Sequence, residues 1–425
     1  MSLRSTLAPL AVSVTLLAGP VLHAADPAAP APKEAAPAPE KASSPAPAAE
    51  KKAASPAKAA EKPKAAPKVK NYALRPDVLD FLAKVAKDEK IPLDWLKKEV
   101  ATARYSPLTE KYSTPKPNAN RKTTPERNFA LYKRNLLTEE RIADGVDFVE
   151  RNRATLERLE KELGVDRHVV AAVIGIESIY GKNMGRFRVI DALMTLSFDY
   201  TRRAGYYKKE LAAYLAYCHR EGLPVTAVRG SFAGAIGLGQ FMPTSLFAYG
   251  KDGNGDGHVD IVECEADGAA SVANFLLEHG WKRGEKPLYP AEANARIFKA
   301  TASGGIKAHT TVGALLKAGV KPKGGWELPD GDAALLVDLP WILADDKKGV
   351  DYFVGTPSFS AILHYNRSYF YAAAVSLLAS ELEDRDAQYL EAVQKRARQA
   401  IGESPAAPEA DKPLEPALRP NDQQN

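Results

Sequence analysis

Hydrophobic residues recur at helical spacing along most of the chain. The first stretch covers residues 79–102 and predicts two short helices, the second of which opens at Pro92. A polar, proline-containing stretch over 106–125 interrupts the pattern. Helical spacing then resumes near Phe148 and continues to about Trp281. Helices are therefore expected to make up most of the fold.

The pattern changes between about Pro287 and Val354. Glycines are frequent there, apolar pieces such as Ala334–Leu339 are short, and prolines stand at the breaks between them. This texture predicts a small mixed α/β subdomain. A final helical region follows from about Tyr369 to Ala400. The predicted fold class is mostly α, of the α+β type.

The two ends of the chain are not expected to join the core. Residues 1–25 carry one charge, Arg4, before an apolar run that ends in small residues, as in a secretory signal peptide. This run is shorter than the roughly 20 residues of a membrane span, and no cysteine near the cleavage site offers a thiol for lipid attachment. Residues 26–70, rich in Ala, Pro and Lys, and 403–425 have the composition of a disordered tether and tail. We expect a soluble periplasmic protein without a stable membrane anchor once the signal peptide is removed.

Charge and cysteine content exclude several classes of protein. The net charge of +5 comes from Arg4 and from the tether, which holds nine Lys against five acidic residues, so the folded part is neutral and no nucleic-acid partner is expected. Metal-binding clusters of Cys and His do not occur in the sequence. The only cysteines are Cys218 and Cys264, for which one disulfide and two free thiols are equally open.

The strongest candidate for catalysis is a carboxylate in an apolar helix. Asp166 can cap this helix, which is apolar on nearly every face and is expected to be buried and to end at Gly181. Because burial raises the pKa of a carboxyl group, Glu177 in this helix suits a general acid. The alternative interpretation is a structural ion pair between Glu177 and Arg202 or Arg203.

Two later segments are candidates for binding a sugar or an amide. Small residues crowd residues 230–240, and Gln240 at the end can both donate and accept hydrogen bonds. Residues 364–371 gather three Tyr, a Phe and an Asn, and such rings with polar tips suit sugar rings. Tight helix packing and an aromatic core explain the two segments equally well when each is considered alone.

A twelve-residue segment over 252–263 matches the calcium loop of an EF-hand. Gly257 stands where that loop turns sharply. The alternative is a polar turn without metal. A calcium ion bound here would have a structural role, and its expected ligands are Asp252, Asn254, Asp256, the carbonyl of His258, Asp260 and Glu263.

Four blocks between about residues 75 and 382 together resemble the lytic murein transglycosylase B family, glycoside hydrolase family 103. They stand in the family's order along the chain. The blocks are Gly175–Gly181, Asp191–Leu196 followed by Arg202 and Arg203, Gly230–Pro243, and Tyr365–Ser368 with Tyr371.

The resemblance implies a lysozyme-like helical catalytic core with an added helical subdomain and a small β-containing subdomain. The expected divisions are a helical subdomain over 71–140, the catalytic core over 141–286, the α/β subdomain over 287–357 and a C-terminal core segment over 358–402. The resemblance also implies a set of residues that bind the substrate. Ser231, Gln240, Tyr365, Asn366 and Tyr371 would line the sugar subsites, Arg202 and Arg203 would face the peptide stem or a muramoyl carboxylate, and Tyr132 belongs to the same set.

The implied reaction cleaves the β-1,4 bond between N-acetylmuramic acid and N-acetylglucosamine in peptidoglycan. Glu177 would act first as acid and then as base, and a 1,6-anhydro end would form without a catalytic cofactor. Two alternatives stay open, a hydrolytic muramidase and a non-catalytic scaffold that binds peptidoglycan. We expect a monomer whose main partner is the glycan strand, with proteins of cell-wall synthesis or remodelling as further candidates.

Overall fold

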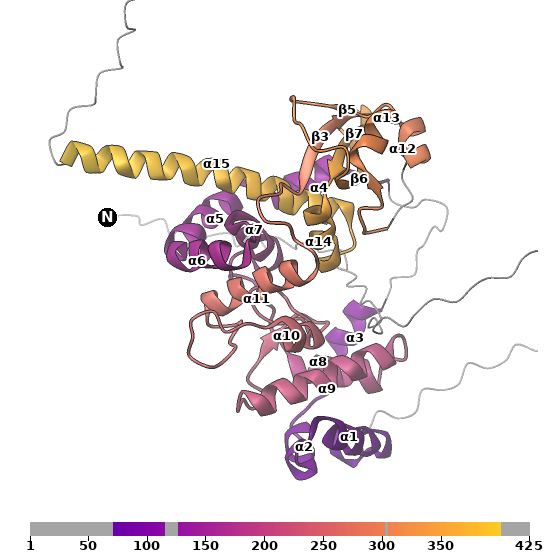
Figure 1. Cartoon of the computed structure of the whole chain (residues 1–425). Coiled ribbons are helices and arrows are strands. Elements are labelled where there is room, and N and C mark those ends of the chain that lie inside the picture. The colour runs from indigo at the N-terminus through magenta and orange to yellow at the C-terminus, as the bar shows by residue number, and fades with distance from the viewer. Residues whose placement is uncertain (1–70, 115–125, 302–304, 401–425) are drawn as a thin grey trace, which may run out of the picture.

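The computed structural model describes residues 71–114, 126–301 and 305–400. The predicted signal peptide, tether and tail lie outside these residues. Within them the chain forms fifteen α-helices and seven strands (Figure 1). The predicted fold class, mostly helical with a small β-containing part, is confirmed.

The two short helices predicted first are α1 (Pro76–Glu89) and α2 (Leu93–Val100), and Pro92 is the N-cap residue of α2. A third helix, α3 (Pro107–Ser113), lies in the polar stretch over 106–125, where the hydrophobic pattern predicts an interruption. Its local signals were present, because Pro107 occupies the first turn and the Ser106 hydroxyl accepts a hydrogen bond from the backbone N–H of Thr109.

Eight helices form the central part of the fold, and most of their apolar residues join one large hydrophobic core. The helical spacing around Phe148 covers two of them, because the chain breaks between α5 and α6 at Asn152. α7 packs against α5, α11 and α15, and α8 packs against α9. The eight are α4 (Phe129–Leu136), α5 (Glu139–Arg151), α6 (Arg153–Leu163), α7 (Arg167–Ser178), α8 (Val189–Phe198), α9 (Ala204–Arg220), α10 (Pro243–Tyr249) and α11 (Glu265–Glu278).

The predicted mixed segment contains a five-stranded antiparallel sheet with the order β4-β6-β7-β3-β5. One face of β6 helps to form a second, smaller core with α13, while alternate residues of β6 face the main core. The elements are β3 (Leu288–Glu292), α12 (Ala295–Thr301), β4 (Thr310–Thr311), α13 (Val312–Lys317), β5 (Lys321–Pro322), β6 (Ala333–Ile342) and β7 (Lys348–Gly355).

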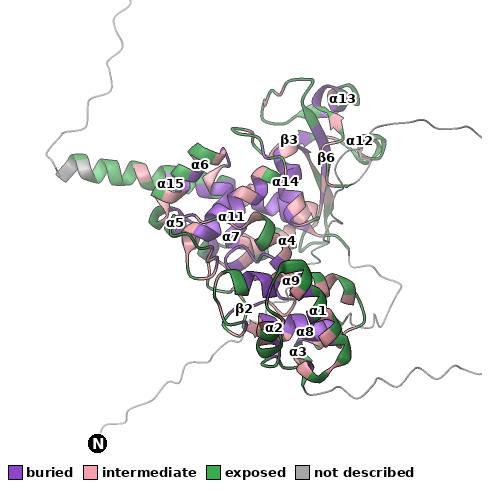
Figure 2. Cartoon of the chain, turned by 60° about the horizontal axis from the view of Figure 1, so that its bottom comes forward, coloured by how far each residue is buried: buried purple, intermediate pink, exposed green. Residues whose placement is uncertain are grey.

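The chain returns to the main core through α14 (Pro357–Tyr365) and α15 (Tyr369–Ala400). α15 begins beside α14 and its far end projects from the molecule, where Figure 2 shows mostly exposed residues. No helix in the described ranges has both the length and the apolar character needed to cross a membrane. Cys218 and Cys264 are free thiols, so the disulfide alternative is not realised.

Candidate active site

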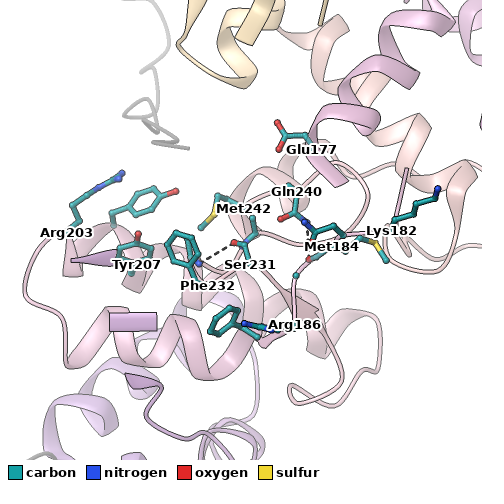
Figure 3. A pocket seen from close by; sticks show the side chains of 16 residues that line it. Glu177, Lys182, Met184, Arg186, Arg203, Tyr207, Ser231, Phe232, Gln240 and Met242 are labelled. Carbon is teal, nitrogen blue, oxygen red and sulfur yellow. Dashed lines mark hydrogen bonds between the residues drawn. The ribbon is translucent and has the colours of Figure 1, made fainter. Parts of the chain in front are cut away.

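α7 carries Glu177 to the wall of a cavity. The Asp166 carboxylate caps the helix by accepting the N–H groups of His168 and Val169 at 2.8 and 2.9 Å. The helix ends at Ser178, earlier than the predicted Gly181, because Ile179 takes a left-handed conformation with φ of 54°. Glu177 therefore lies in the last turn, half-buried, and its carboxylate projects beyond the ribbon (Figure 3).

The surroundings of Glu177 make its carboxyl group a weaker acid than a carboxyl group in water. Burial raises its pKa from 4.5 to about 7, and a hydrogen bond from the Tyr371 hydroxyl to Oε1, at 2.7 Å, opposes this rise. Among the described residues no lysine or arginine forms an ion pair with Glu177, so the pair proposed with Arg202 or Arg203 is not found. A carboxyl group with a pKa near 7 can both donate and accept a proton at neutral pH.

The cavity has a volume of about 600 Å³ and is lined by residues between Glu177 and Tyr207 and by residues of the third sequence block. Four of the predicted site residues border it: Glu177, Arg203, Ser231 and Gln240. Glu177 is the only acidic residue among the described residues that line it. Its wall also includes residues that the sequence analysis did not single out, among them Met184, Phe187, Tyr206, Tyr207, Phe232 and Met242.

Ser231 and Gln240 are held by their own turn. The Ser231 hydroxyl accepts the N–H groups of Ala233 and Ala235 at 3.3 and 3.0 Å. The Gln240 amide donates to the carbonyls of Gly237 and Met184 at 2.8 and 3.1 Å, and its backbone is left-handed with φ of 49°. The Gln240 amide oxygen has no hydrogen-bond donor from the described residues, so it is available to a ligand.

The predicted aromatic set divides into two roles. Tyr371 contacts Glu177, and burial together with the charge of Glu177 raises the pKa of Tyr132 to about 12, which places Tyr132 near the same carboxylate. Tyr365 is buried, stacks on Tyr371 and donates its hydroxyl to the carbonyl of Gly239, so it supports the turn before Gln240 and does not line the cavity.

The remaining two predicted residues lie outside the cavity lining. Asn366 is the half-buried residue after α14, and Arg202 is exposed in the loop before α9. The structure therefore does not place either side chain against the 600 Å³ cavity.

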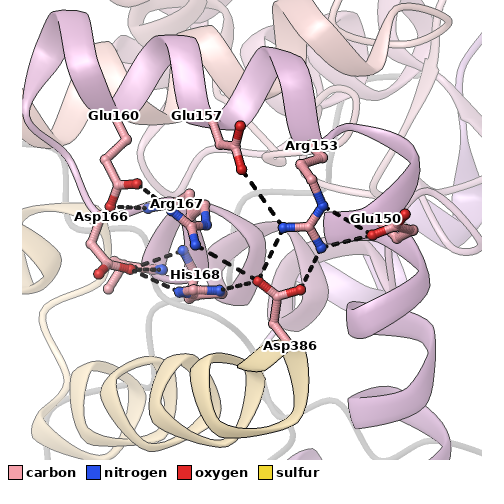
Figure 4. Close-up of polar contacts among 9 residues, drawn as sticks. Glu150, Arg153, Glu157, Glu160, Asp166, Arg167, His168 and Asp386 are labelled. Carbon is pink, nitrogen blue, oxygen red and sulfur yellow. Dashed lines mark hydrogen bonds and ion pairs between the residues drawn. The ribbon is translucent and has the colours of Figure 1, made fainter. Parts of the chain in front are cut away.

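A polar network at the other end of α7 anchors the helix (Figure 4). Its centre is the buried Asp386 of α15, which accepts from Arg153 at 2.5 Å and lies 3.2 Å from Nε2 of His168. Burial raises the pKa of Asp386, but the hydrogen bonds from Arg153 and His168 outweigh it and hold the pKa below its usual value. This network fixes α6, α7 and α15 together, and Tyr371, which contacts Glu177, also belongs to α15.

The predicted calcium loop closes on itself through its own side chains. Asp252 accepts the N–H groups of Gly255 and Gly257 at 2.6 and 2.8 Å, which lowers its pKa. The carboxylate of Asp267, which the sequence analysis missed, is buried and accepts the N–H groups of Gly253 and Asp260 at 2.8 and 2.7 Å. No group of three or more His, Cys, Asp or Glu stands ready to hold a metal among the described residues.

The donor types in the loop nevertheless fit calcium. The ligands expected from positions 1, 3, 5, 7 and 12 are all oxygens, and Gly257 has φ of 89° where the loop must turn. Asn254 and Asp256 are exposed and bonded only within the loop. Binding would require Glu263, which is exposed, to turn toward them.

Comparison with known families gives a match over most of the chain. The sequence profile described as the transglycosylase SLT domain matches residues 73–380. A curated relative, the membrane-bound lytic murein transglycosylase B of Escherichia coli, is 35% identical over 251 residues, which are 59% of this chain. The match spans 66% of that relative, slightly less than two thirds of its length.

Solved structures of similar proteins share the fold. The catenated lytic transglycosylase SltB1 of Pseudomonas aeruginosa is 32% identical with a TM-score of 0.67, over 74% of this chain and 100% of that chain. The Escherichia coli lytic transglycosylase SLT35 in complex with calcium is 29% identical with a TM-score of 0.63, over 74% and 95%. SltB3 of Pseudomonas aeruginosa in complex with NAG-anhNAM-pentapeptide is 29% identical with a TM-score of 0.62, over 72% and 79%.

Proposed function

Because the chain belongs to the transglycosylase SLT domain family, we propose that it is a lytic transglycosylase that cleaves peptidoglycan strands. The family assignment made from the four sequence blocks is thereby confirmed. The single observation that carries the activity is Glu177, a lone carboxyl group on the wall of the cavity whose pKa is raised to about 7.

In the first step Glu177 is protonated and donates its proton to the glycosidic oxygen that links N-acetylmuramic acid to N-acetylglucosamine. The bond between this oxygen and C1 of the muramoyl residue breaks, and the N-acetylglucosamine end leaves as an alcohol. The hydrogen bond from Tyr371 then supports the carboxylate form of Glu177, because its hydroxyl donates to Oε1 at 2.7 Å.

In the second step Glu177 accepts the proton of the muramoyl C6 hydroxyl while that oxygen bonds to C1. This closes the 1,6-anhydro ring and returns Glu177 to its protonated form. Ordinary glycosidases use a pair of carboxylates. The absence of a second acidic residue from the described lining of the cavity supports a reaction in which the substrate provides its own nucleophile. The complex of SltB3 with NAG-anhNAM-pentapeptide supports the same product.

Among the residues proposed to hold the substrate, Ser231, Gln240 and Arg203 border the cavity, and Tyr132 lies near Glu177. Tyr371 acts on Glu177 directly, whereas Tyr365 acts as a positioning residue through Gly239. The proposal for Arg202 and Asn366 rests on the family resemblance alone.

Mass spectrometry of the products from purified sacculi tests the proposed reaction. Transglycosylation releases anhydro products, which are one water lighter than the hydrolysis products of a muramidase and have no reducing end. Glu177→Gln is expected to lower the rate at least a hundredfold, while Glu381→Gln, which removes an exposed carboxyl group on α15, leaves it unchanged. Products with reducing ends would instead identify a muramidase, and unchanged lysis by Glu177→Gln would remove the catalytic role of this residue.

We also propose that the loop over 252–263 binds calcium as a structural ion. Support comes from its oxygen donors and from the calcium complex of the similar SLT35. The expected ligands are Asp252, Asn254, Asp256, the carbonyl of His258, Asp260 and Glu263. A bound ion would offset the negative charge of the loop and fix the chain between Gln240 and α11.

The proposed setting is the periplasm, with the enzyme acting as a soluble monomer after removal of its signal peptide. The peptidoglycan complexes of similar structures support glycan strands as the partner. The domain divisions predicted from the sequence remain part of this proposal, including the small subdomain over 287–357 that contains the five-stranded sheet.

A further inference from the structure

A second, smaller cavity of about 300 Å³ adjoins the catalytic one. The two cavities share Arg186 and Phe187 as lining residues. In Figure 3, Arg186 and Glu177 lie on opposite sides of the other labelled residues. We call this second cavity the arginine pocket, because Arg186, Arg188 and Arg229 line it and Asp191 is the only acidic residue among its described lining.

The arrangement of the arginines leaves positive charge without a counterion. The short strands β1 (Phe187–Arg188) and β2 (Arg229–Gly230) pair so that Arg188 and Arg229 are direct cross-strand partners. Two like charges directly opposite each other destabilise a strand pair. Within the described part of the chain, neither Arg186 nor Arg229 forms an ion pair, and Arg229 donates only to the backbone carbonyl of Arg186 at 3.3 Å.

Asp191 does not satisfy the donors of Arg188. Its Oδ1 is already bonded to the backbone N–H of Arg104 at 2.8 Å, and its Oδ2 lies 3.5 Å from Nε of Arg188. That Nε atom is buried and makes no hydrogen bond with the described residues. A buried donor without a partner is costly, so nothing in the described residues neutralises this cluster fully. An anion that enters the pocket would reach Arg186 and Arg229, which are exposed, and would compensate their charge.

We propose that the arginine pocket binds a carboxylate of the peptide attached to the glycan strand that occupies the catalytic cavity. This inference rests on the proposed function. The sugars next to the scissile bond present hydroxyl and amide groups, whereas a peptide carries a carboxylate at its C-terminus. The guanidinium group matches the planar carboxylate through two parallel hydrogen bonds, which selects it over neutral groups.

The remaining lining suits a chain that passes from one cavity into the other. Phe187 borders both cavities, and Tyr112 of α3 packs edge-on against Phe187 and Phe232 at ring-centroid distances of 6.2 and 5.7 Å. Leu108, also on α3, lines the pocket and is 46% exposed. α3 therefore provides an apolar border over which the peptide would extend, and the arginines hold its charged end.

The test uses Arg229→Gln in the full chain, because this side chain is exposed and, unlike Arg186, does not line the catalytic cavity. The matched control is Arg296→Gln, which removes the same charge from an exposed position of α12. Rates are measured on glycan strands that carry their peptides and on the same strands after an amidase has removed the peptides, which replaces each distant peptide C-terminus by a lactyl carboxylate directly on the sugar. Binding of a free stem pentapeptide is compared with binding of its C-terminal amide.

We expect Arg229→Gln to lose about tenfold in kcat/KM on peptide-bearing strands, mainly through a higher KM. Cleavage of peptide-free strands should stay within about twofold, and Arg229→Lys should recover part of the loss. The wild-type protein should bind the pentapeptide more tightly than its amide.

An equal loss on both substrates, or no loss on either, would overturn the proposal, as would equal binding of the acid and the amide. Preferential binding of inorganic phosphate over the pentapeptide would assign the pocket to a phosphate-bearing polymer and also overturn it. A wild-type protein that cleaves neither kind of strand would instead refute the proposed function.

Discussion

Replacing Glu177 by Gln should make the protein more stable, and the gain should depend on pH. The folded protein raises the pKa of Glu177 from 4.5 to about 7, chiefly by burial. Below pH 4.5 the carboxyl group is protonated in both the folded and unfolded states, so it contributes no difference. As the pH rises from 4.5 to 7, the unfolded state loses this proton first, and the folded state loses stability relative to it.

Each pH unit of this interval corresponds to about 1.36 kcal/mol, so the full cost above pH 7 is at most about 3.4 kcal/mol. Solvent in the cavity lowers this value, because Glu177 is half-buried. Gln resembles the protonated carboxyl group and keeps an oxygen that accepts from Tyr371. The gain of Glu177→Gln should therefore be near zero at pH 4.5 and largest above pH 7, where it corresponds to several degrees in Tm.

Chemical unfolding of the wild type and the variant, measured between pH 4 and pH 8, checks this reasoning. Glu381→Gln is the control, because it removes an exposed carboxyl group of α15 and should show no such pH dependence. A gain that is constant with pH would refute the argument from burial. A loss of stability that grows toward neutral pH would show that Glu177 is held by a positive charge.

Three further changes test other contacts. Tyr371→Phe removes the hydrogen bond that favours the Glu177 carboxylate, so the pKa should rise further and the alkaline limb of the kcat/KM profile should move up by about one pH unit. Asp386→Ala leaves Arg153 without its buried partner and should lower the free energy of unfolding by about 3 kcal/mol at neutral pH. Calcium at ten times its Kd should stabilise the wild type by about 1.4 kcal/mol, and Glu263→Gln should weaken this effect in a thermal-shift assay.

Each of these three predictions has an outcome that would contradict it. An unmoved alkaline limb in Tyr371→Phe would mean that another group controls the profile. The folded state holds the pKa of Asp386 below its usual value, so the stabilisation is present at neutral pH and is lost as the pH falls. An effect of Asp386→Ala that grows at low pH would contradict this. Equal melting temperatures with chelator and with millimolar calcium would refute calcium binding.

Several features of this protein follow from local sequence alone. The Asp166 cap and the continuous apolar run define α7, because capping and helix propensity act within a few residues. An acidic residue in such a run must meet an apolar environment wherever the helix packs, so the raised pKa of Glu177 was predictable. The helix α15 was also predicted correctly over Tyr369–Ala400, because its helical spacing is a local property of the sequence.

The partners of these groups were decided only by the tertiary structure. Tyr371 stands 194 residues from Glu177 in the chain. The sequence around Tyr365 and Tyr371 does not indicate that the Tyr371 hydroxyl bonds to the Glu177 carboxylate, or that the Tyr365 hydroxyl bonds to the carbonyl of Gly239. The arginine pocket likewise depends on the register of β1 and β2, which places Arg188 opposite Arg229 across 41 residues of chain. Local rules act over one or two helical turns, whereas such contacts depend on how the distant helices and strands pack together.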